Sequence, residues 1–524
     1  MKTARRSRQS GVLGLLLVAL LLLGGVLFAF TSLNIAAVRV DRERATNVAL
    51  AKAKDALIAY AVADVNRPGQ LPCPDMNDDG IADSVAFGAC TNLIGRLPWV
   101  TLGLPDLRDD SGERLWYAVS NDFRTDYNAT PAVALNSDTA YRAGNAALVL
   151  AGTTPAANLA ALVIAPGGTL TRSDGRVQTR ACAGACDARD FLDIAAGEDN
   201  GDATNRTFVA ASRSSSFNDT LMPVFSDDIM RLVERRAARE LAQHLRDHYD
   251  MWENALVNNT RGFYPFAVAF NNPSTPQLGT DDNPAGLMPL SSARLTWSNL
   301  SPGCWTESAG TVLRCQTLVF CVAVCVPSSL SARINNVANR FVDAPQPADF
   351  QFLGVNLIGG GPTWTLNPAA RRLEFTYSGI IAAGWLDIQV KAPVTSSWLP
   401  NSWLTANNWH QITGYAFSPA YAIDGTGSCG GAGPPCISVS TSIVPTSDLR
   451  AAALVAGRTL PSAGQTLRPV ATPANPNQFF EGLNPDVTYT ALEFSGRSLT
   501  FNDSLSGDTG NPLPRRRVWP WAEP

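Results

Sequence analysis

One uninterrupted helical pattern covers the first sixty residues and constrains everything that follows. Residues 12–30 form a run of 19 residues without a charge, mostly Leu, Val, Ala and Phe. At a rise of about 1.5 Å per residue, such a helix matches a hydrocarbon core about 30 Å thick. Residues 38–62 contain neither Pro nor Gly, and their apolar residues recur at helical spacing. We therefore expect one continuous helix over residues 12–64, which begins in a membrane and ends in a soluble domain. The residues expected near one apolar stripe are Val38, Ala45, Ala49, Leu57 and Tyr60.

The charges beside the apolar run predict its orientation. Arg5, Arg6 and Arg8 precede the run, and the residues just after it are poor in charge. Under the positive-inside rule, the N-terminus then lies in the cytoplasm and the bulk of the chain outside it. A cleaved secretory signal is the alternative. It is disfavoured because the run is long, no small-x-small cleavage site follows residue 30, and the helical pattern continues beyond it.

Length and composition set broad limits on the class of protein. The chain has 524 residues, room for two to four domains, with 45% hydrophobic and 16% charged residues. Its net charge of −4 is nearly neutral for this length. The charge therefore gives no electrostatic argument for nucleic-acid binding.

Cysteine usage points to an oxidising compartment. Ten cysteines, an even number, follow the predicted anchor in local groups, which favours disulfides. Reduced core cysteines and zinc ligands are the alternatives, but the spacings are CxxxC or longer and the chain has three His. The ten are Cys73, Cys90, Cys182, Cys186, Cys304, Cys315, Cys321, Cys325, Cys429 and Cys436.

Several pairings follow from the spacing. Cys73 and Cys90 bracket one loop, and Cys429 and Cys436 close another. Cys182 and Cys186 can close a tight loop if the chain turns between them.

A strand over residues 317–326 would separate Cys321 from Cys325 by about 13 Å on one face, too far for a disulfide. Cys304 and Cys315 would then be their cross-strand partners.

An Asp-rich loop lies inside the first cysteine bracket. Residues 75–83 read D-x-N-x-D-G-x-x-D, the first nine positions of an EF-hand-type calcium loop, with Gly80 at the sharp turn. The twelfth position is Ala86 instead of a bidentate Glu, and no helices flank the loop, which excludes a full EF-hand. A short calcium loop and a solvated Asp/Asn/Gly turn both remain open. The candidate ligands are Asp75, Asn77, Asp79, the carbonyl of Ile81, and Asp83.

Beyond this loop, short β-like runs precede a second long helix. The runs cover residues 115–120, 146–151, 159–165 and 207–211. The helix covers residues 226–256, with Ser226 as a good N-cap and Glu234 on its solvated side.

Two parts of the chain resemble each other. Residues 159–221 contain LAALVIAPGGTL, FLDIAAGEDN and SSSFNDTL, and residues 449–505 contain LRAAALVAGRTL, FFEGLNPD and SLTFNDSL in the same order. We therefore expect one α+β unit used twice, with the helix over 226–256 as the counterpart of the anchor helix. Residues 287–393, rich in alternating patterns, are expected to be an all-β insertion in the second copy. The expected domains are a basic leader (1–11), the helix (12–64), the first α+β domain (65–225), the start of the second copy (226–286), the insertion (287–393), the rest of the second copy (394–510) and an irregular tail (511–524).

The N-terminus resembles that of type IV pilins and type II secretion pseudopilins, in which a basic leader and a Gly precede the membrane helix. By this resemblance Gly11 is the residue before a prepilin-peptidase cut and Val12 is the first mature residue. Family members usually carry Glu at the fifth mature position, where this chain has Leu16. A buried Glu is costly in a membrane, and its absence favours a minor or tip subunit over a filament-building one.

A second segment also resembles a known group. Residues 67–120 contain RPGQLPCPD, GRLPWVTLGLPDL and GERLWYAVS, which look like an uncharacterised group of bacterial prepilin-like proteins. The resemblance covers the chain to about residue 260. It implies a pilin-like helix on an antiparallel sheet, anchored in the bacterial inner membrane and exposed to the periplasm or, in a filament, to the cell surface. The implied partners are other pilin or pseudopilin subunits, prepilin peptidase, and membrane lipid around the helix.

Catalytic motifs do not stand out. The chain has no P-loop, no GxSxG and no HExxH. His244 and His248 lie four residues apart on the predicted helix, but no acidic third ligand is obvious, so we expect a solvated or interface pair. His410 lies between aromatic residues and is expected to be structural.

These observations predict a membrane-anchored pilin-like structural or assembly subunit that is not an enzyme. One alternative is an adhesin-like protein whose β insertion binds a surface ligand, with exposed tryptophans as the binding surface. A signal-anchored periplasmic enzyme is the less favoured alternative. Calcium is the one cofactor that the sequence suggests.

Overall fold

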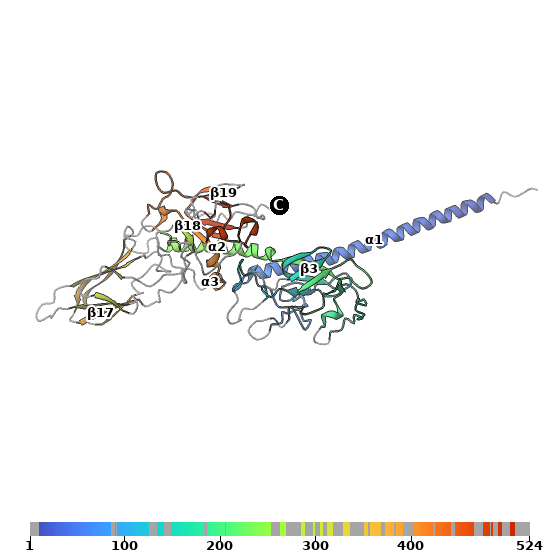
Figure 1. Cartoon of the computed structure of the whole chain (residues 1–524), viewed down its shortest axis with the longest axis horizontal. Helices are drawn as coiled ribbons and strands as arrows, with labels where there is room; N and C mark the ends of the chain where they lie inside the picture. The colour runs from blue at the N-terminus through green and yellow to red at the C-terminus, as the bar shows by residue number, and fades with distance from the viewer. Residues whose placement is uncertain are drawn as a thin grey trace, which may run out of the picture. The chain divides into compact units, whose positions relative to one another are not determined.

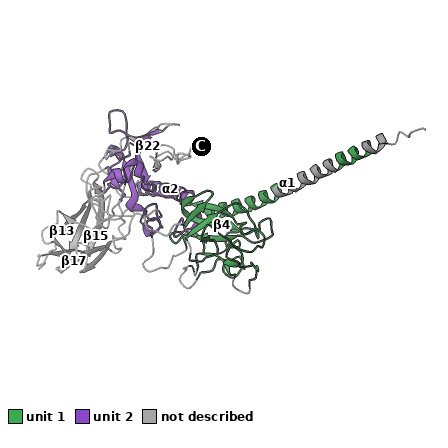
Figure 2. Cartoon of the chain, turned by 45° about the vertical axis from the view of Figure 1, so that its right-hand side comes forward, with its two compact units in different colours: residues 1–60, 71–126, 146–225 green, residues 61–70, 127–145, 226–524 purple. Residues whose placement is uncertain are grey.

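The chain divides into two compact units (Figure 2). Unit 1 contains residues 1–60, 71–126 and 146–225, and unit 2 contains residues 61–70, 127–145 and 226–524. The computed structural model describes the backbone of residues 10–84, 90, 92–124, 134–140, 148–182, 186–204, 206–252, 262–268, 284–288, 297–298, 304–307, 312–317, 328–335, 350–354, 357–367, 372–381, 384–390, 403–422, 425–441, 446–465, 475–482, 484–485, 491–494 and 503–508.

Helix α1 (Ser10–Ala63) runs for 54 residues without a break (Figure 1). Of its N-terminal half, side chains are described for residues 16–23, where the leucines and Val18 are 56–68% exposed. The other side chains of the predicted span 12–30 lie outside the described residues. No helix in the described part of the chain has both the length and the apolar character needed to cross a bilayer.

The C-terminal part of α1 is amphipathic, as predicted, although the buried stripe differs in detail. Of the expected stripe, Ala49 and Leu57 are buried, Tyr60 is half-buried and Ala45 is exposed, while the side chain of Val38 is not described. The helix reaches strand β8 (Thr220–Phe225) through Lys54, whose Nζ donates to the carbonyl of Pro223 at 3.1 Å. Buried residues that the prediction missed are Leu50, Ala53 and Ala61.

Unit 1 contains a mixed sheet in which β4 is central. The strand order is β1-β2-β4-β3-β7, and β8 also pairs with β4. All of these pairings are antiparallel except β3 with β7. The four predicted runs correspond to β2, β3, β4 and β7, so these strands are confirmed. The bounds are β1 (Ile94–Arg96), β2 (Trp116–Val119), β3 (Leu148–Gly152), β4 (Ala156–Ala165), β5 (Ile194–Ala195), β6 (Glu198–Asp199), β7 (Thr207–Ala210) and β8 (Thr220–Phe225).

Unit 2 packs helix α2 (Ser226–Trp252) on a second antiparallel sheet of order β23-β21-β18-β9. Helix α2 begins at Ser226, as predicted, and its expected end at residue 256 lies outside the described residues. Glu234, expected on the solvated side, is instead fully buried, and Ser137 Oγ donates to its Oε1 at 2.6 Å. The remaining bounds are β9 (Ala285–Leu287), α3 (Trp403–Ala406), β18 (Thr413–Phe417), β19 (Ile437–Thr441), β20 (Thr446–Leu449), β21 (Ala451–Val455), β22 (Ala491–Phe494) and β23 (Ser504–Asp508).

The region of the expected insertion contains two 4-stranded antiparallel sheets, of order β10-β13-β16-β15 and β11-β12-β17-β14. The register of β11 and β12 sets Cys304 directly opposite Cys315. This differs from the expected pairing of both with Cys321 and Cys325, which lie outside the described residues. The bounds are β10 (Trp297–Ser298), β11 (Cys304–Glu307), β12 (Val312–Thr317), β13 (Ser328–Asn335), β14 (Phe350–Gly354), β15 (Leu357–Asn367), β16 (Arg372–Ile381) and β17 (Gly384–Val390).

The two units share one strand order. In unit 1, β1, β2, β4 and β8 are neighbours in that order, and in unit 2 the same order is β9, β18, β21 and β23. A side-chain hydrogen bond recurs at the same place in both. The hydroxyl of Tyr117 in β2 donates to the carbonyl of Pro72 at 3.2 Å, and the hydroxyl of Tyr415 in β18 donates to that of Pro265 at 3.0 Å.

The last turn of α1, which belongs to unit 2, is closed by a cation from α2. Arg236 Nη1 donates to the carbonyls of Val62 and Asp64, both at 2.7 Å, and its Nε donates to Glu240 Oε1 at 2.8 Å. The last carbonyls of a helix have no intrahelical partner and carry partial negative charge, so a guanidinium there is stabilising.

Replacing Arg236 tests this helix cap. We expect Arg236→Ala to lower the free energy of unfolding by about 2–3 kcal/mol, because charge-assisted hydrogen bonds to otherwise unpaired carbonyls are lost. The free energy of unfolding of Arg236→Lys should lie between those of the wild type and Arg236→Ala, because an ammonium can donate to the carbonyls but cannot also make the Nε bond to Glu240. The control is Arg239→Ala, an exposed arginine on the same helix, and urea denaturation is the measurement. Equal midpoints for the two alanine variants would contradict the role given to Arg236.

Candidate functional site

The loop that follows α1 is folded around the carboxylate of Asp75. This side chain is 1% exposed, and its Oδ1 accepts the N–H groups of Asn77 at 3.0 Å and Asp78 at 2.7 Å. Its Oδ2 accepts the N–H of Gly80 at 2.6 Å. Burial raises the pKa of Asp75, while these three N–H bonds act in the opposite direction. Asp75 therefore holds the loop by binding its backbone.

The other candidate calcium ligands also bind backbone groups of the loop. Asn77 Oδ1 accepts the N–H of Asp79 at 3.1 Å, Asp79 Oδ1 that of Ile81 at 2.7 Å, and Asp83 Oδ2 that of Met76 at 2.6 Å. No three carboxylates of this fully described loop bring their oxygen atoms within 4.8 Å of one another. The four candidate side chains are therefore engaged with the loop's own backbone, calcium binding by this loop stays a prediction, and we derive no chemistry through that ion.

Gly80 is required where the sequence pattern places the turn. Its φ is +84°, a conformation that favours glycine, and an added Cβ would lie 2.5 Å from Nε1 of Trp99. The Gly80 carbonyl accepts the N–H of Val100 at 2.8 Å. The turn is thereby attached to the segment that follows β1.

Three of the expected disulfides are confirmed. Cys73 and Cys90 are joined across the Asp-rich loop with a Cα–Cα distance of 5.2 Å, and both are buried. The other two bonds join Cys182 to Cys186 and Cys429 to Cys436.

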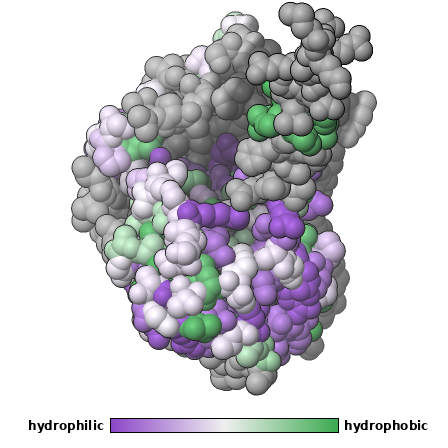
Figure 3. All heavy atoms as spheres, turned by 90° about the vertical axis from the view of Figure 1, so that its right-hand side faces the viewer, coloured by the Kyte–Doolittle hydropathy of each residue, from purple (hydrophilic) through white to green (hydrophobic). Residues whose placement is uncertain are grey.

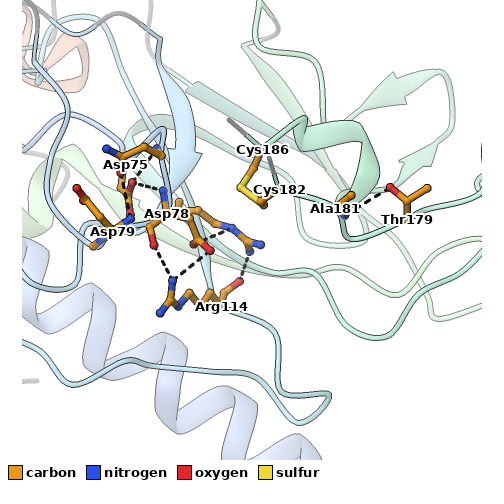
Figure 4. The surroundings of a disulfide bond; sticks show 11 residues. Asp75, Asp78, Asp79, Arg114, Thr179, Ala181, Cys182 and Cys186 are labelled. Carbon is orange, nitrogen blue, oxygen red and sulfur yellow. Dashed lines mark hydrogen bonds and ion pairs between the residues drawn. A yellow bond between two sulfur atoms is a disulfide. The ribbon is translucent and has the colours of Figure 1, made fainter. Parts of the chain in front are cut away.

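An ionic cluster lies beside the second of these disulfides (Figure 4). Its centre is Asp78, a residue with φ of +68° in the middle of the Asp-rich loop. Arg114 Nη1 lies 3.1 Å from Asp78 Oδ2 and also donates to the Asp78 carbonyl at 2.7 Å. Arg96 Nε lies 3.5 Å from Asp78 Oδ1. Arg114 is itself held by Asp106, through Nε to Oδ1 at 3.0 Å.

Arg96 carries its charge into the core of unit 1. Only 4% of the residue is exposed, and its guanidinium lies 4.8 Å from the ring centroid of Trp116 and 4.1 Å from that of Phe191. Its Nη1 donates to the Arg114 carbonyl at 2.8 Å. Burial lowers the pKa of Arg96 to about 10, which still leaves the group charged at neutral pH.

Sequence reasoning missed Asp78, Arg96 and Arg114 as a group. The signal was present, because GRLPW contains Arg96 and GERLW contains Arg114. Nothing in the sequence pattern, however, indicated that β1 and β2 pair so that both arginines reach the same loop.

A second cluster buries two carboxyl groups. Asp219 Oδ2 accepts the N–H of Asp193 at 2.8 Å and Nδ2 of Asn200 at 2.9 Å. Asp193 Oδ2 in turn accepts the N–H groups of Asn218 at 2.6 Å and Asp219 at 3.1 Å. Burial, followed by the neighbouring Asp193, raises the pKa of Asp219 well above its ordinary value, and burial also raises the pKa of Asp193. Burial therefore favours the protonated form of both carboxyl groups.

Unit 2 contains the same arrangement with one changed residue. Asp503 Oδ2 accepts the N–H of Glu481 at 3.1 Å and Nδ2 of Asn484 at 2.9 Å. A glutamine donates to the first carboxylate in both units, Gln178 to Asp193 and Gln465 to Glu481. The cluster is therefore a recurring support for the fold.

The three histidines do not form a site. His248 is 3% exposed, with Nδ1 3.2 Å from the carbonyl of Phe263, so the expectation of a solvated or interface pair is wrong for this residue. Burial lowers the pKa of His244, and burial lowers that of His410 to about 4. Neither His244 nor His248 belongs to a metal-capable group within the described residues. His410 is buried, as expected of a structural residue.

Comparisons of the chain with protein-family models, with curated proteins and with solved structures find no match.

The buried carboxyl pair of unit 1 predicts a pH-dependent stability. A raised pKa means that the folded state binds the proton more tightly than the unfolded state. The resulting stabilisation is complete below the ordinary aspartate pKa of about 3.9 and is lost as pH rises through the raised values. Asp219→Asn cannot ionise, so this variant should gain stability relative to the wild type as pH rises above the ordinary aspartate pKa of about 3.9, by roughly 1.4 kcal/mol per unit of difference between the folded and unfolded pKa.

The measurement is the urea unfolding midpoint at several pH values. Asp55→Asn, on the exposed side of α1, is the matched control. Parallel pH profiles for the wild type and Asp219→Asn would show that the pair does not carry a proton in the folded state.

Proposed function

We propose that this chain is a membrane-anchored, pilin-like or pseudopilin-like structural subunit, and not an enzyme. It stands in the bacterial inner membrane as a minor or tip component, with most of its mass in the periplasm or, after assembly, at the cell surface. Its partners are other pilin-like subunits, surrounding lipid, and prepilin peptidase during maturation.

The observation that carries this proposal is the division of α1 into two different halves. The leucines at 16, 17 and 20–23 are exposed on a helix that stands clear of the sheet, whereas Leu50, Ala53 and Leu57 are fully buried. An exposed run of leucines is costly in water and suits a lipid or a helical partner. We expect a helix to be apolar on all sides in one part and amphipathic in the other when it lies first in a lipid or helical environment and then against a soluble domain.

Disulfides support the proposed location. The bond between Cys73 and Cys90 closes a loop with a sequence separation of 17 at the end of the anchor helix. Such bonds persist in oxidising compartments such as the bacterial periplasm and are rare in the cytoplasm. The basic residues before the apolar run give the same orientation by an independent argument.

The shared strand order supports a duplicated pilin-like unit. In this proposal α1 and α2 are equivalent helices, each leading into a chain segment whose Pro carbonyl accepts a Tyr hydroxyl. The equivalent carboxyl clusters, at Asp193 and at Glu481, support the same relation. In this proposal the first copy alone has its helix extended into a membrane.

The insertion supports a second candidate function, an adhesin-like head on the pilin-like base. Strands β10 to β17 pair with one another and with no other described strand. Such a module can carry a binding surface without altering the sheet of unit 2. Figure 3 shows one larger apolar group at the upper right, bordered by residues that are not described, and smaller apolar patches among polar side chains on the rest of the described face.

Processing at Gly11 tests the main proposal. In cells that contain prepilin peptidase, we expect mass spectrometry to find Val12 as the first residue, because the enzyme cuts after the Gly of such leaders. In cells without the peptidase the chain should begin at or near Met1. A Gly11→Ala variant should show whether the cut depends on this residue. A start beyond residue 30, or a start unaffected by the peptidase, would contradict the prepilin interpretation.

Removing the insertion tests the second candidate. We expect replacement of residues 297–390 by a short Gly-Ser linker to abolish adhesion of cells that display the protein. Strands β9 and β18 lie outside the replaced segment and pair with each other, so export and the protease-resistant core should persist. Normal adhesion by this variant, at equal surface amounts, would exclude the insertion as the head.

A further inference from the structure

The disulfide between Cys182 and Cys186 lies against the carboxylate of Asp78 (Figure 4). One oxygen of Asp78 and the two Sγ atoms lie within 4.8 Å of one another. Within the described residues, no other three His, Cys, Asp or Glu side chains bring ligand atoms this close together. Two distant parts of unit 1, the Asp-rich loop and the segment that follows Val177, therefore meet at one point.

The position of Asp78 is fixed by its surroundings. Its N–H donates to Asp75 Oδ1 at 2.7 Å, and its carbonyl accepts Nη1 of Arg114 at 2.7 Å. Its carboxylate is paired with Arg114 and Arg96, at 3.1 and 3.5 Å. A ligand that is already oriented by second contacts loses little entropy when it binds a metal.

We propose that reduction of this disulfide creates a metal site, in which the two thiolates and the Asp78 carboxylate bind a divalent cation of the zinc class. The spacing Cys-x3-Cys alone does not indicate zinc, but the fold brings the Asp78 carboxylate to the two sulfur atoms as a third ligand, and a water molecule completes the tetrahedron. Two thiolates and one carboxylate carry three negative charges against two on the metal. Arg96 and Arg114 offset the remaining charge, so the site needs no further ligand for balance.

The redox step is an ordinary exchange with a dithiol reductant. A thiolate of the reductant attacks Sγ of Cys182, which is solvent-exposed, and Cys186 leaves as a thiolate. The second thiolate of the reductant then releases Cys182 and closes the reductant's own disulfide. The protein gains two electrons and two protons, and both protons pass to solvent when the metal binds the thiolates.

The other two described disulfides do not combine solvent exposure with a neighbouring carboxylate. The bond between Cys73 and Cys90 is buried, with 2% and 7% exposure of the two residues, so a reductant has little access. The bond between Cys429 and Cys436 belongs to no metal-capable group within the described residues. The site also involves no residue of α1, so its test is independent of the proposed anchoring.

Zinc retention by the full-length protein tests the proposal. The purified protein is treated with a dithiol under native conditions, loaded with zinc chloride, passed through a desalting column and analysed for metal by mass spectrometry. We expect the reduced protein to retain one zinc ion per chain more than the oxidised protein. A double Cys182→Ser, Cys186→Ser variant should lose that ion, and Asp78→Asn should bind it at least about tenfold more weakly.

Matched controls separate this site from other thiols and from general damage. Asp79→Asn alters an exposed carboxylate of the same loop and should leave zinc retention unchanged. A double Cys429→Ser, Cys436→Ser variant should also retain the ion. Circular dichroism shows whether each variant is folded. The proposal is overturned if the reduced wild type retains no additional zinc, or if the folded Cys182→Ser, Cys186→Ser variant retains as much as the wild type.

Discussion

Long irregular segments connect the strands of both units, and their backbone N–H groups need acceptors that strand pairing does not supply. Buried backbone donors without partners cost as much as a lost hydrogen bond, so this requirement constrains the whole fold. Buried carboxylates meet it. Asp109 is an example, because its Oδ1 accepts the N–H of Ser111 at 2.9 Å while its Oδ2 accepts that of Gly167 at 2.8 Å, from a different loop. Asp75, Asp193 and Asp219 act in the same way.

This arrangement explains why carboxylates are poor guides to chemistry in this chain. An Asp-rich loop has the spacing of a calcium site, yet its four candidate side chains, at positions 75, 77, 79 and 83, each accept a backbone N–H, because short polar side chains readily accept hydrogen bonds from nearby residues. Asp219 and Asp503 are buried close to a second carboxyl group, as catalytic acids often are. Each of them, however, joins two chain segments by accepting a backbone N–H from the other segment. Burial together with hydrogen bonds to nearby backbone N–H and side-chain amide groups is evidence for a structural role.

Periodic features of the fold could be predicted from the sequence, and features that depend on long-range pairing could not. The long first helix, the start of α2 at Ser226, and strands β2, β3, β4 and β7 follow from apolar spacing and capping residues, which act locally. Glu234 was placed on the solvated side because helical periodicity cannot reveal that Ser137, almost a hundred residues away in the sequence, covers it. Similarly, Arg96 and Arg114 converge on Asp78 only through the pairing of β1 with β2.

Comparison of the two units separates what the fold requires from what it does not. In unit 1 the N–H and carbonyl groups of Asp75 and Arg96 bond to each other at 3.0 and 2.7 Å, and in unit 2 those of Val268 and Leu287 do the same at 3.0 and 2.7 Å. The backbone of this region therefore forms equally well with two apolar residues. A buried arginine is costly where a leucine would serve, because taking a charge out of water is unfavourable even when it is paired. The fold alone does not account for the cluster of Asp78, Arg96 and Arg114. The metal site proposed beside the exposed disulfide gives the cluster a role.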